Sequence, residues 1–208
     1  MRLGIFGGSF DPPHVGHLLV AQDAVAALSL HRLLIVPAAQ QPLKQGQHTS
    51  ANHRLDMVLR CFERVPGMVV DPIEIERGGL SYMVDTVESL QRCEPTAELY
   101  LLIGEDVVAT LPQWREPERL RSMARLVILR RDFVNEGADA RSTQRDAPGL
   151  PVQHLAVRRV DVSSTEIRAR VRAGRSIRGF VTDAVADYIA SAGLYLRDSV
   201  AEDVSARA

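Results

Sequence analysis

The sequence has few cysteines, few aromatic residues and no long apolar run, and its charges nearly cancel. Its 208 residues include two cysteines, one tryptophan and a formal net charge of −1. Cys61 and Cys93 lie in predicted helices without metal-ligand spacing, so we expect reduced thiols rather than a disulfide scaffold or a zinc site. A nearly neutral chain argues against a nucleic-acid coat or a membrane-surface binder.

The chain also lacks the hydrophobic segments that direct proteins to membranes. No apolar run approaches the roughly 18 residues of a spanning helix, and the start MRLGIFGG does not have the architecture of a signal peptide. We therefore expect a cytoplasmic protein. Arginines are nevertheless grouped between 119 and 131 and between 158 and 178. Such groups suit either a small polyanion or solvated helix faces.

The apolar pattern alternates between strand-like and helix-like segments. The predicted strands cover residues 2–6, 33–37, 68–70, 73–75, 99–103, 125–129 and 152–157, and the predicted helices cover 15–28, 50–62, 83–93, 164–173 and 182–191. This alternation predicts one α/β domain over residues 1–196, with a doubly wound, mostly parallel sheet and helices on both faces. We expect a flexible surface loop at 131–151 and a disordered tail at 197–208.

The segment GGSFDPPHVGH, residues 7–17, is typical of a phosphate-binding loop. Gly7 and Gly8 follow a predicted strand, so backbone amides can approach an anion closely. The helix that follows adds unpaired N–H groups and the positive end of its dipole. His14 and His17 are three residues apart and share one helix face, from which imidazole donors can stabilise charge on a transferring phosphoryl group.

The segment VSSTEIR, residues 162–168, has a second possible anion site. Ser163 and Glu166 form a capping box, which by itself requires only a well-started helix. The hydroxyls and Arg168 one turn later can also complete a phosphate site at that helix start. Because a globular fold can bring the two segments to opposite ends of one triphosphate, their combination predicts a nucleotidyl-transfer enzyme.

Both segments resemble the motifs H-x-G-H and S-S-T-x-x-R of the nucleotidyltransferase superfamily, which implies its Rossmann-like fold. The resemblance places His14 and His17 at the α- and β-phosphates of ATP. It places four residues at the outer phosphates: Ser163, Ser164, Thr165 and Arg168. It also assigns to the ATP site Gly7, Gly8, Ser9 and Phe10.

Further stretches resemble bacterial nicotinate mononucleotide adenylyltransferases through most of the chain. They are PAAQQPLK (37–44), RLDMVL (54–59), EIERGGLSYMVDT (74–86), IGEDVVATLPQW (103–114) and FVTDAVADYIASAGLY (180–195). The ATP residues that this resemblance adds are Gly104, Asp106 and Arg130. The substrate residues that it implies are Ser9, Lys44, Tyr82, Asp85, Thr86, Trp114 and Arg115.

Each of these residues also has an ordinary structural interpretation. A lone lysine is usually a solvated surface residue, a single tryptophan is more often part of the core, and Ser81, Asp85 or Thr86 can simply cap a helix. The chain also departs from the family pattern in two places. Arg115 stands where an aromatic residue is common, and Arg130-Arg131-Asp132 stands where the family has R-P-G.

The resemblance implies transfer of the adenylyl group of ATP to nicotinate mononucleotide, which gives deamido-NAD and pyrophosphate. His14, His17, Lys44 and Arg168 would be catalytic, with Mg²⁺ carried mainly by the ATP phosphates and no metal site on protein ligands alone. Alternative acceptors are nicotinamide mononucleotide and, less suited to His14 and to the chain length, phosphopantetheine. A non-catalytic nucleotide-binding protein is the alternative from another class. The sequence does not determine the oligomeric state.

Overall fold

The computed structural model describes residues 1–43, 49–131, 141–142 and 152–196. Its strands are β1 (Arg2–Gly8), β2 (Arg32–Pro37), β3 (Met68–Val70), β4 (Glu98–Gly104), β5 (Arg125–Arg131), β6 (Arg141–Ser142) and β7 (Gln153–Val157). Its helices are α1 (Val15–Leu28), α2 (Ala51–Phe62), α3 (Ile73–Arg77), α4 (Met83–Cys93), the 3₁₀ segment η1 (Glu105–Gln113), α5 (Pro117–Met123), α6 (Ser164–Arg172) and α7 (Asp183–Ser191). Within these residues no helix is both long and apolar enough to cross a membrane.

The strands form one sheet in the order β3-β2-β1-β4-β5-β7-β6. All neighbours pair in parallel except β6, which runs antiparallel to β7. The predicted doubly wound, mostly parallel sheet is therefore confirmed. Since β6 lies inside 131–151, part of that predicted loop is a short edge strand, while the rest of the loop and the tail at 197–208 lie outside the described residues.

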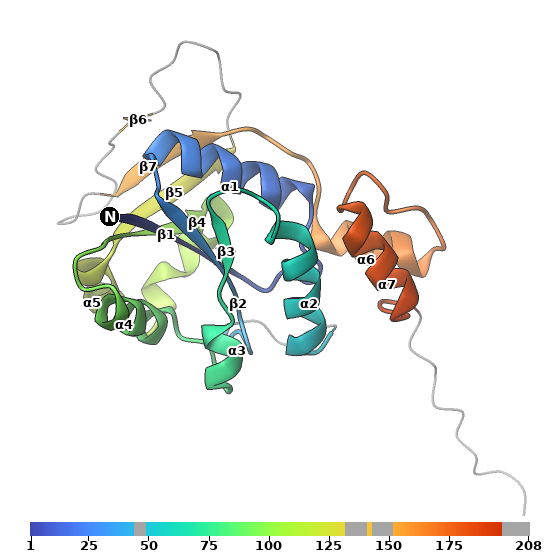
Figure 1. Ribbon diagram of the computed structural model, residues 1–208, viewed down its shortest axis with the longest axis horizontal. Coiled ribbons are helices and arrows are strands. Elements are labelled where there is room, and N and C mark those ends of the chain that lie inside the picture. The colour runs from blue at the N-terminus through green and yellow to red at the C-terminus, as the bar shows by residue number, and fades with distance from the viewer. Residues whose placement is uncertain (44–48, 132–140, 143–151, 197–208) are drawn as a thin grey trace, which may run out of the picture.

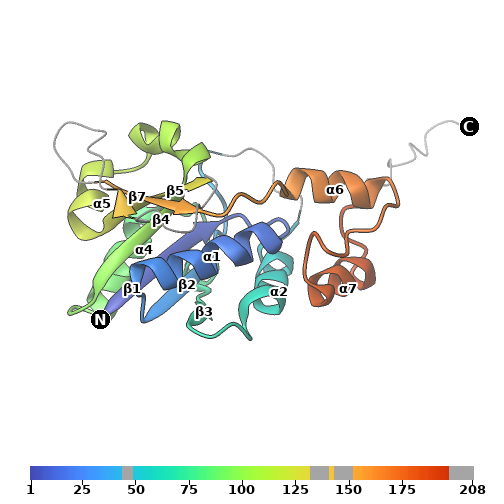
Figure 2. The same cartoon turned by 90° about the horizontal axis from the view of Figure 1, so that it is seen from above.

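The central residues of β2, β4 and β5 are consecutive buried apolar residues because both faces of the sheet are covered. On β5, Val127 and Leu129 belong to one buried cluster, whereas Leu126 and Ile128 belong to the other. The first cluster joins the sheet to α1, α2, α6 and α7, and the second joins it to α4, η1 and α5. Figures 1 and 2 show these two layers, with α6 and α7 standing beside α2 at one end of the molecule.

The prediction of a strand at 73–75 is wrong, because this segment is the short helix α3. Pro72 fixes the backbone just before it, and the Asp71 carboxylate accepts a hydrogen bond from the Ile73 amide at 3.0 Å. Gly78, with φ 70°, ends the helix. Its buried residue is Glu74 rather than an isoleucine, so the alternation of apolar residues did not mark a strand face.

Candidate active site

The chain reverses its direction across the sheet between β1 and β4, which are neighbouring parallel strands. The connection after β1 leads to α1 on one face, and the connection after β4 leads to η1 on the other. Ligands of open α/β sheets bind at such a reversal, outside the carboxyl ends of the strands. Among the predicted site residues of the described chain, Gly8 and Gly104 end strands at this edge, and others lie in the loops and helices that follow.

Gly7 and Gly8 are the last residues of β1, where the predicted turn is instead strand, and neighbouring side chains approach both of them closely. A β-carbon on Gly7 would lie 2.6 Å from the terminal methyl of Met83, and one on Gly8 would lie 3.1 Å from the Phe10 ring. This close approach brings the start of α4 against the loop after β1. Phe10 itself is 2% exposed and packs edge-on against Phe6 and Phe62, so its side chain belongs to the core.

The two histidines at the start of α1 form a stacked pair. Their ring centroids are 3.7 Å apart, and the His14 amide donates to Nδ1 of His17 at 3.2 Å. Because Nδ1 of His17 accepts this bond, the neutral ring carries its hydrogen on Nε2 and can donate it to an anion. A β-carbon on Gly16 would lie 3.0 Å from the His14 ring, so glycine makes room for the stack.

The start of α6 is hydrogen-bonded directly to the loop after β1. The Ser164 hydroxyl donates to the Pro12 carbonyl at 2.8 Å, and the Arg168 guanidinium donates to the Asp11 carbonyl at 2.7 Å. Arg168 also donates to the Thr165 hydroxyl at 3.2 Å, while the Ser163 hydroxyl accepts from the Glu166 amide and caps the helix. The structure thus brings together the two segments on which the sequence prediction depended.

Arg54 is a site residue that the sequence reasoning missed. It is fully buried in α2 and donates to the carbonyls of Ser9, Ala38 and Ala39, so it joins the loops that follow β1 and β2. Burial lowers the pKa of Arg54, and the nearby Asp11 carboxylate opposes that shift. The available signal was its helical spacing, because Arg54 shares the buried face of α2 with Met57, Val58, Cys61 and Phe62.

Asp11 is a second missed residue and is 5% exposed. Its carboxylate accepts hydrogen bonds from the Tyr195 hydroxyl at 2.6 Å and from the Thr49 hydroxyl at 2.8 Å. Burial and this carboxylate both raise the pKa of Tyr195. Asp11 therefore ties the loop after β1 to the end of the chain and to the segment that follows the predicted Lys44 loop. Lys44 itself lies outside the described residues.

Thr86 lies at the start of α4 but is wholly buried. Its hydroxyl donates to the Glu74 carboxylate at 2.7 Å and accepts from Arg77 at 3.0 Å. Burial raises the pKa of Glu74, while bonds from Thr86 and Ser81 act in the opposite direction. The Thr86 hydroxyl is thus already engaged within the protein, and its predicted contact with the substrate stays a prediction. Ser81 does not cap α4; its hydroxyl accepts from the Ala39 amide.

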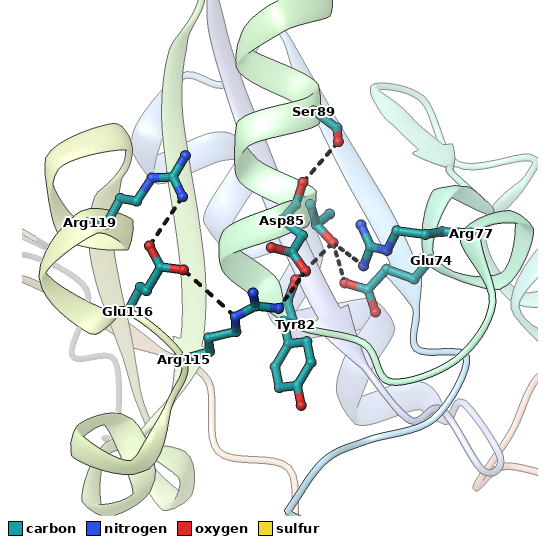
Figure 3. A network of polar contacts seen from close by, with 9 residues as sticks. Glu74, Arg77, Tyr82, Asp85, Ser89, Arg115, Glu116 and Arg119 are labelled. Carbon is teal, nitrogen blue, oxygen red and sulfur yellow. Dashed lines mark hydrogen bonds and ion pairs between the residues drawn. The ribbon is translucent and has the colours of Figure 1, made fainter.

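Tyr82, Asp85 and Arg115 lie together beside the start of α4. The Arg115 guanidinium is 4.9 Å from the Tyr82 ring centroid and 3.5 Å from the Asp85 carboxylate (Figure 3). Trp114 is partly buried against the apolar layer of α4 and η1, and its indole N–H donates to the Thr110 hydroxyl at 3.1 Å. Both interpretations of the tryptophan, core residue and ligand platform, are compatible with this position.

Gly104 ends β4 and pairs with Leu129, so it lies beside Arg130 at the same edge of the sheet. A β-carbon on Gly104 would lie 2.5 Å from the Asp106 carboxylate, which therefore folds back over the glycine. Arg130 lies 3.7 Å from the Glu105 carboxylate. Over the described ranges no cluster of three or more histidine, cysteine or acidic residues is placed to hold a metal ion.

Comparisons with known proteins agree with this geometry. A family model described as cytidylyltransferase-like matches residues 5–170. A probable nicotinate-nucleotide adenylyltransferase of Gemmatimonas aurantiaca is 64% identical over 195 residues, which are 94% of this chain and 92% of that protein. The chain belongs to this family of nicotinate-nucleotide adenylyltransferases. A relative with the same name from Thermus thermophilus is 42% identical and is covered over its whole length by 94% of this chain.

A solved structure shows the same fold at low sequence identity. The Plasmodium falciparum nicotinic acid mononucleotide adenylyltransferase complexed with NaAD has a TM-score of 0.70 and 20% identity, over 93% of this chain and 97% of its own. The likeness confirms the Rossmann-like nucleotidyltransferase architecture inferred from the two motifs. It does not test the residue roles, which stay predictions.

Proposed function

We propose that this protein transfers the adenylyl group of ATP to nicotinate mononucleotide, giving deamido-NAD and pyrophosphate. One observation carries the proposal: Ser164 and Arg168 of α6 are hydrogen-bonded to Pro12 and Asp11, beside the His14–His17 pair. This contact brings the two helix starts together, and we infer that they bind the phosphates of one ATP molecule. The name shared by the relatives supports nicotinate mononucleotide as the acceptor.

In the proposed reaction an oxygen of the acceptor 5′-phosphate attacks the α-phosphorus of ATP. The bond from that phosphorus to the bridging oxygen breaks, and the electron pair leaves with pyrophosphate. Since the attacking phosphate is already an anion, the step needs no general base. The protein's task is to align the two phosphates and stabilise the charge on the leaving group.

The two proposed phosphate-binding segments, residues 7–17 and 162–168, have different parts in this task. The His17 Nε2–H is a donor for the charge that develops between the α- and β-phosphates, and stacking on His14 fixes its ring. The first turn of α6 supplies hydroxyls, and Arg168 supplies a cation, for the outer phosphates. Lys44 is proposed as a further cation. Arg54 positions the loops after β1 and β2 through their carbonyls.

We propose that magnesium would enter this site as part of its complex with the nucleotide. The Asp11 carboxylate already accepts bonds from Tyr195 and Thr49, and the described chain holds no cage of acidic ligands. We propose that ATP phosphates and water carry Mg²⁺, with the protein contributing its histidines and arginines. When bound, the ion neutralises phosphate charge.

The test is pyrophosphate release from ATP and Mg²⁺ with nicotinate and nicotinamide mononucleotides assayed side by side. We expect release that depends on acceptor and is faster with the nicotinate compound. Comparable rates would assign dual acceptor use. ATP binding without release with either acceptor would favour phosphopantetheine, which is assayed next, and failure there would leave a non-catalytic nucleotide-binding protein.

A further inference from the structure

Arg115 is placed between two carboxylates and an aromatic ring. Its guanidinium is 3.5 Å from Asp85 and 3.7 Å from Glu116, and it lies 4.9 Å from the centre of the Tyr82 ring (Figure 3). The side chain is 51% exposed. Both ion pairs are long, so each holds the guanidinium weakly against solvent.

The neighbouring Arg119 is held much more tightly. It contacts Glu88 at 2.6 Å and Glu116 at 3.1 Å, so it shares one carboxylate with Arg115. Two arginines four residues apart thus face the same acidic surface, yet only Arg119 has close partners there. Arg115 is therefore the arginine that can change partner at small cost.

The position of Arg115 connects it with the phosphate-binding loop. Met83 packs against Gly7, the preceding Tyr82 begins α4, and Arg115 lies over the Tyr82 ring. Arg115 also directly follows Trp114, which lies at the end of η1. The guanidinium thus contacts Tyr82, the chain neighbour of the residue that packs against Gly7, on the side of the sheet that α4 and η1 cover.

We propose that Arg115 selects an acidic acceptor by exchanging the Asp85 carboxylate for the carboxylate on the acceptor's ring. A planar guanidinium binds a carboxylate through two parallel hydrogen bonds, which a neutral carboxamide cannot match. Asp85 is then a competitor that holds Arg115 until the acceptor arrives. This role depends on the adenylyl transfer proposed above, and it assigns the discrimination between acid and amide to one pair of side chains.

The experiment compares kcat/KM for nicotinate and nicotinamide mononucleotides in the full-length enzyme and three variants. Arg115→Met should lower the nicotinate-to-nicotinamide ratio by about tenfold or more, because a charge-assisted bond is lost with one acceptor only. Asp85→Asn should raise the ratio by about two- to fivefold, since it removes an exposed competing pair. Arg121→Met is the control, because Arg121 pairs with Glu118 and shares no carboxylate with Arg115, and it should leave the ratio unchanged.

Arg115→Met is expected to lower the nicotinate-to-nicotinamide ratio and Asp85→Asn to raise it. These opposite changes distinguish the proposed role from a purely structural ion pair. If Asp85 and Arg115 only stabilised each other, both substitutions would move the ratio in the same direction, and the proposal would be overturned. An unchanged ratio in Arg115→Met would overturn it as well. Arg115→Lys covers the case in which the methionine variant does not fold, and it should keep part of the preference.

Calorimetric binding of each mononucleotide keeps this test independent of turnover. If wild-type protein releases no pyrophosphate with either acceptor, the proposed reaction fails. Weaker binding of the nicotinate compound to Arg115→Met, with nicotinamide binding unchanged, would still support the role of Arg115. Equal binding of the nicotinate compound to both proteins would refute it.

Discussion

At the proposed phosphate end of the site, Asp11 and Pro12 are bound to α6 by hydrogen bonds of 2.7 and 2.8 Å, whereas at the proposed acceptor end Arg115 is held by ion pairs of 3.5 and 3.7 Å. The first contacts join residues 152 and 157 positions apart in the sequence and are partly buried, while the Arg115 contacts are exposed. The comparison suggests that the triphosphate site is formed before substrate binds and that the acceptor site adjusts to its ligand. Preformed donors stabilise a transition state without reorganisation, while a weakly held cation can choose among anions.

The largest effect should come from the histidines of the phosphate end. His14→Ala and His17→Ala should each lower kcat by about 10²- to 10³-fold, with much smaller changes in KM for ATP, because their donors act on charge that develops in the transition state. Steady-state pyrophosphate release measures both constants. His31→Ala, at the opposite edge of the sheet, is the control and should be near wild type. Near-normal turnover in both site variants would contradict the assignment.

Arg54 tests whether the rigidity of the phosphate end depends on buried contacts. Arg54→Met should lower the free energy of unfolding by about 3 kcal/mol, because three carbonyls lose their donor inside the protein. Exposed Arg64 is the matched control, and Arg64→Met should change that free energy by less than about 0.5 kcal/mol. Urea denaturation of both variants makes the comparison. Equal stabilities would show that Arg54 does not hold these loops.

Two variants that each remove a helix cap, one on α6 and one on α7, distinguish an effect on protein stability from an effect on ATP binding. The Ser163 hydroxyl caps α6 and the Thr182 hydroxyl caps α7, so Ser163→Ala and Thr182→Ala should each cost about 1 kcal/mol of stability. Only Ser163→Ala should also raise KM for ATP, by about threefold, since one weak hydrogen bond is worth that factor. An equal rise in both variants would mean that the effect reflects stability alone.

Glu74, at the acceptor end, should give the smallest effect and one that depends on pH. Burial raises the pKa of Glu74 in the folded protein above its ordinary value of 4.5. The protonated side chain therefore contributes its full stabilisation below pH 4.5, and this stabilisation is lost as the pH rises through the folded pKa. Glu74→Gln removes this loss, so the stability of the variant relative to wild type should increase with pH above 4.5. Denaturation curves from pH 4 to 8 measure the difference. A constant difference would show that Glu74 keeps an ordinary pKa.

The sequence was sufficient for the parts of the fold that depend on local pattern. The pairing of His14 with His17 at the start of α1 and the cap at Ser163 follow from short-range spacing, and the structure contains both. The expected turn at Gly7 and Gly8 is instead the end of strand β1, and His14 precedes α1 in an extended conformation. The parallel sheet followed from the alternation of strands and helices. The contact between α6 and the Asp11–Pro12 loop was expected only in outline, as two segments meeting at one ligand.

The features that sequence reasoning missed depend on tertiary contacts. Arg54 was not singled out because its partners are backbone carbonyls of two distant loops, which no residue pattern marks. The helix α3 was predicted as a strand because Ile73 and Ile75 alternate with acidic residues, although Pro72 and Gly78 bound a short helix. Thr86 is buried together with Glu74, twelve residues away, and no spacing in the sequence predicts their hydrogen bond.

The central claim is that the bond between the α- and β-phosphates breaks. Phosphorus NMR of wild-type protein with ATP, Mg²⁺ and nicotinate mononucleotide follows each phosphate separately. We predict loss of the ATP signals with equal amounts of pyrophosphate and of a dinucleotide containing a 5′–5′ pyrophosphate link. Formation of ADP, or ATP that persists unchanged with protein shown to bind it, would contradict the account.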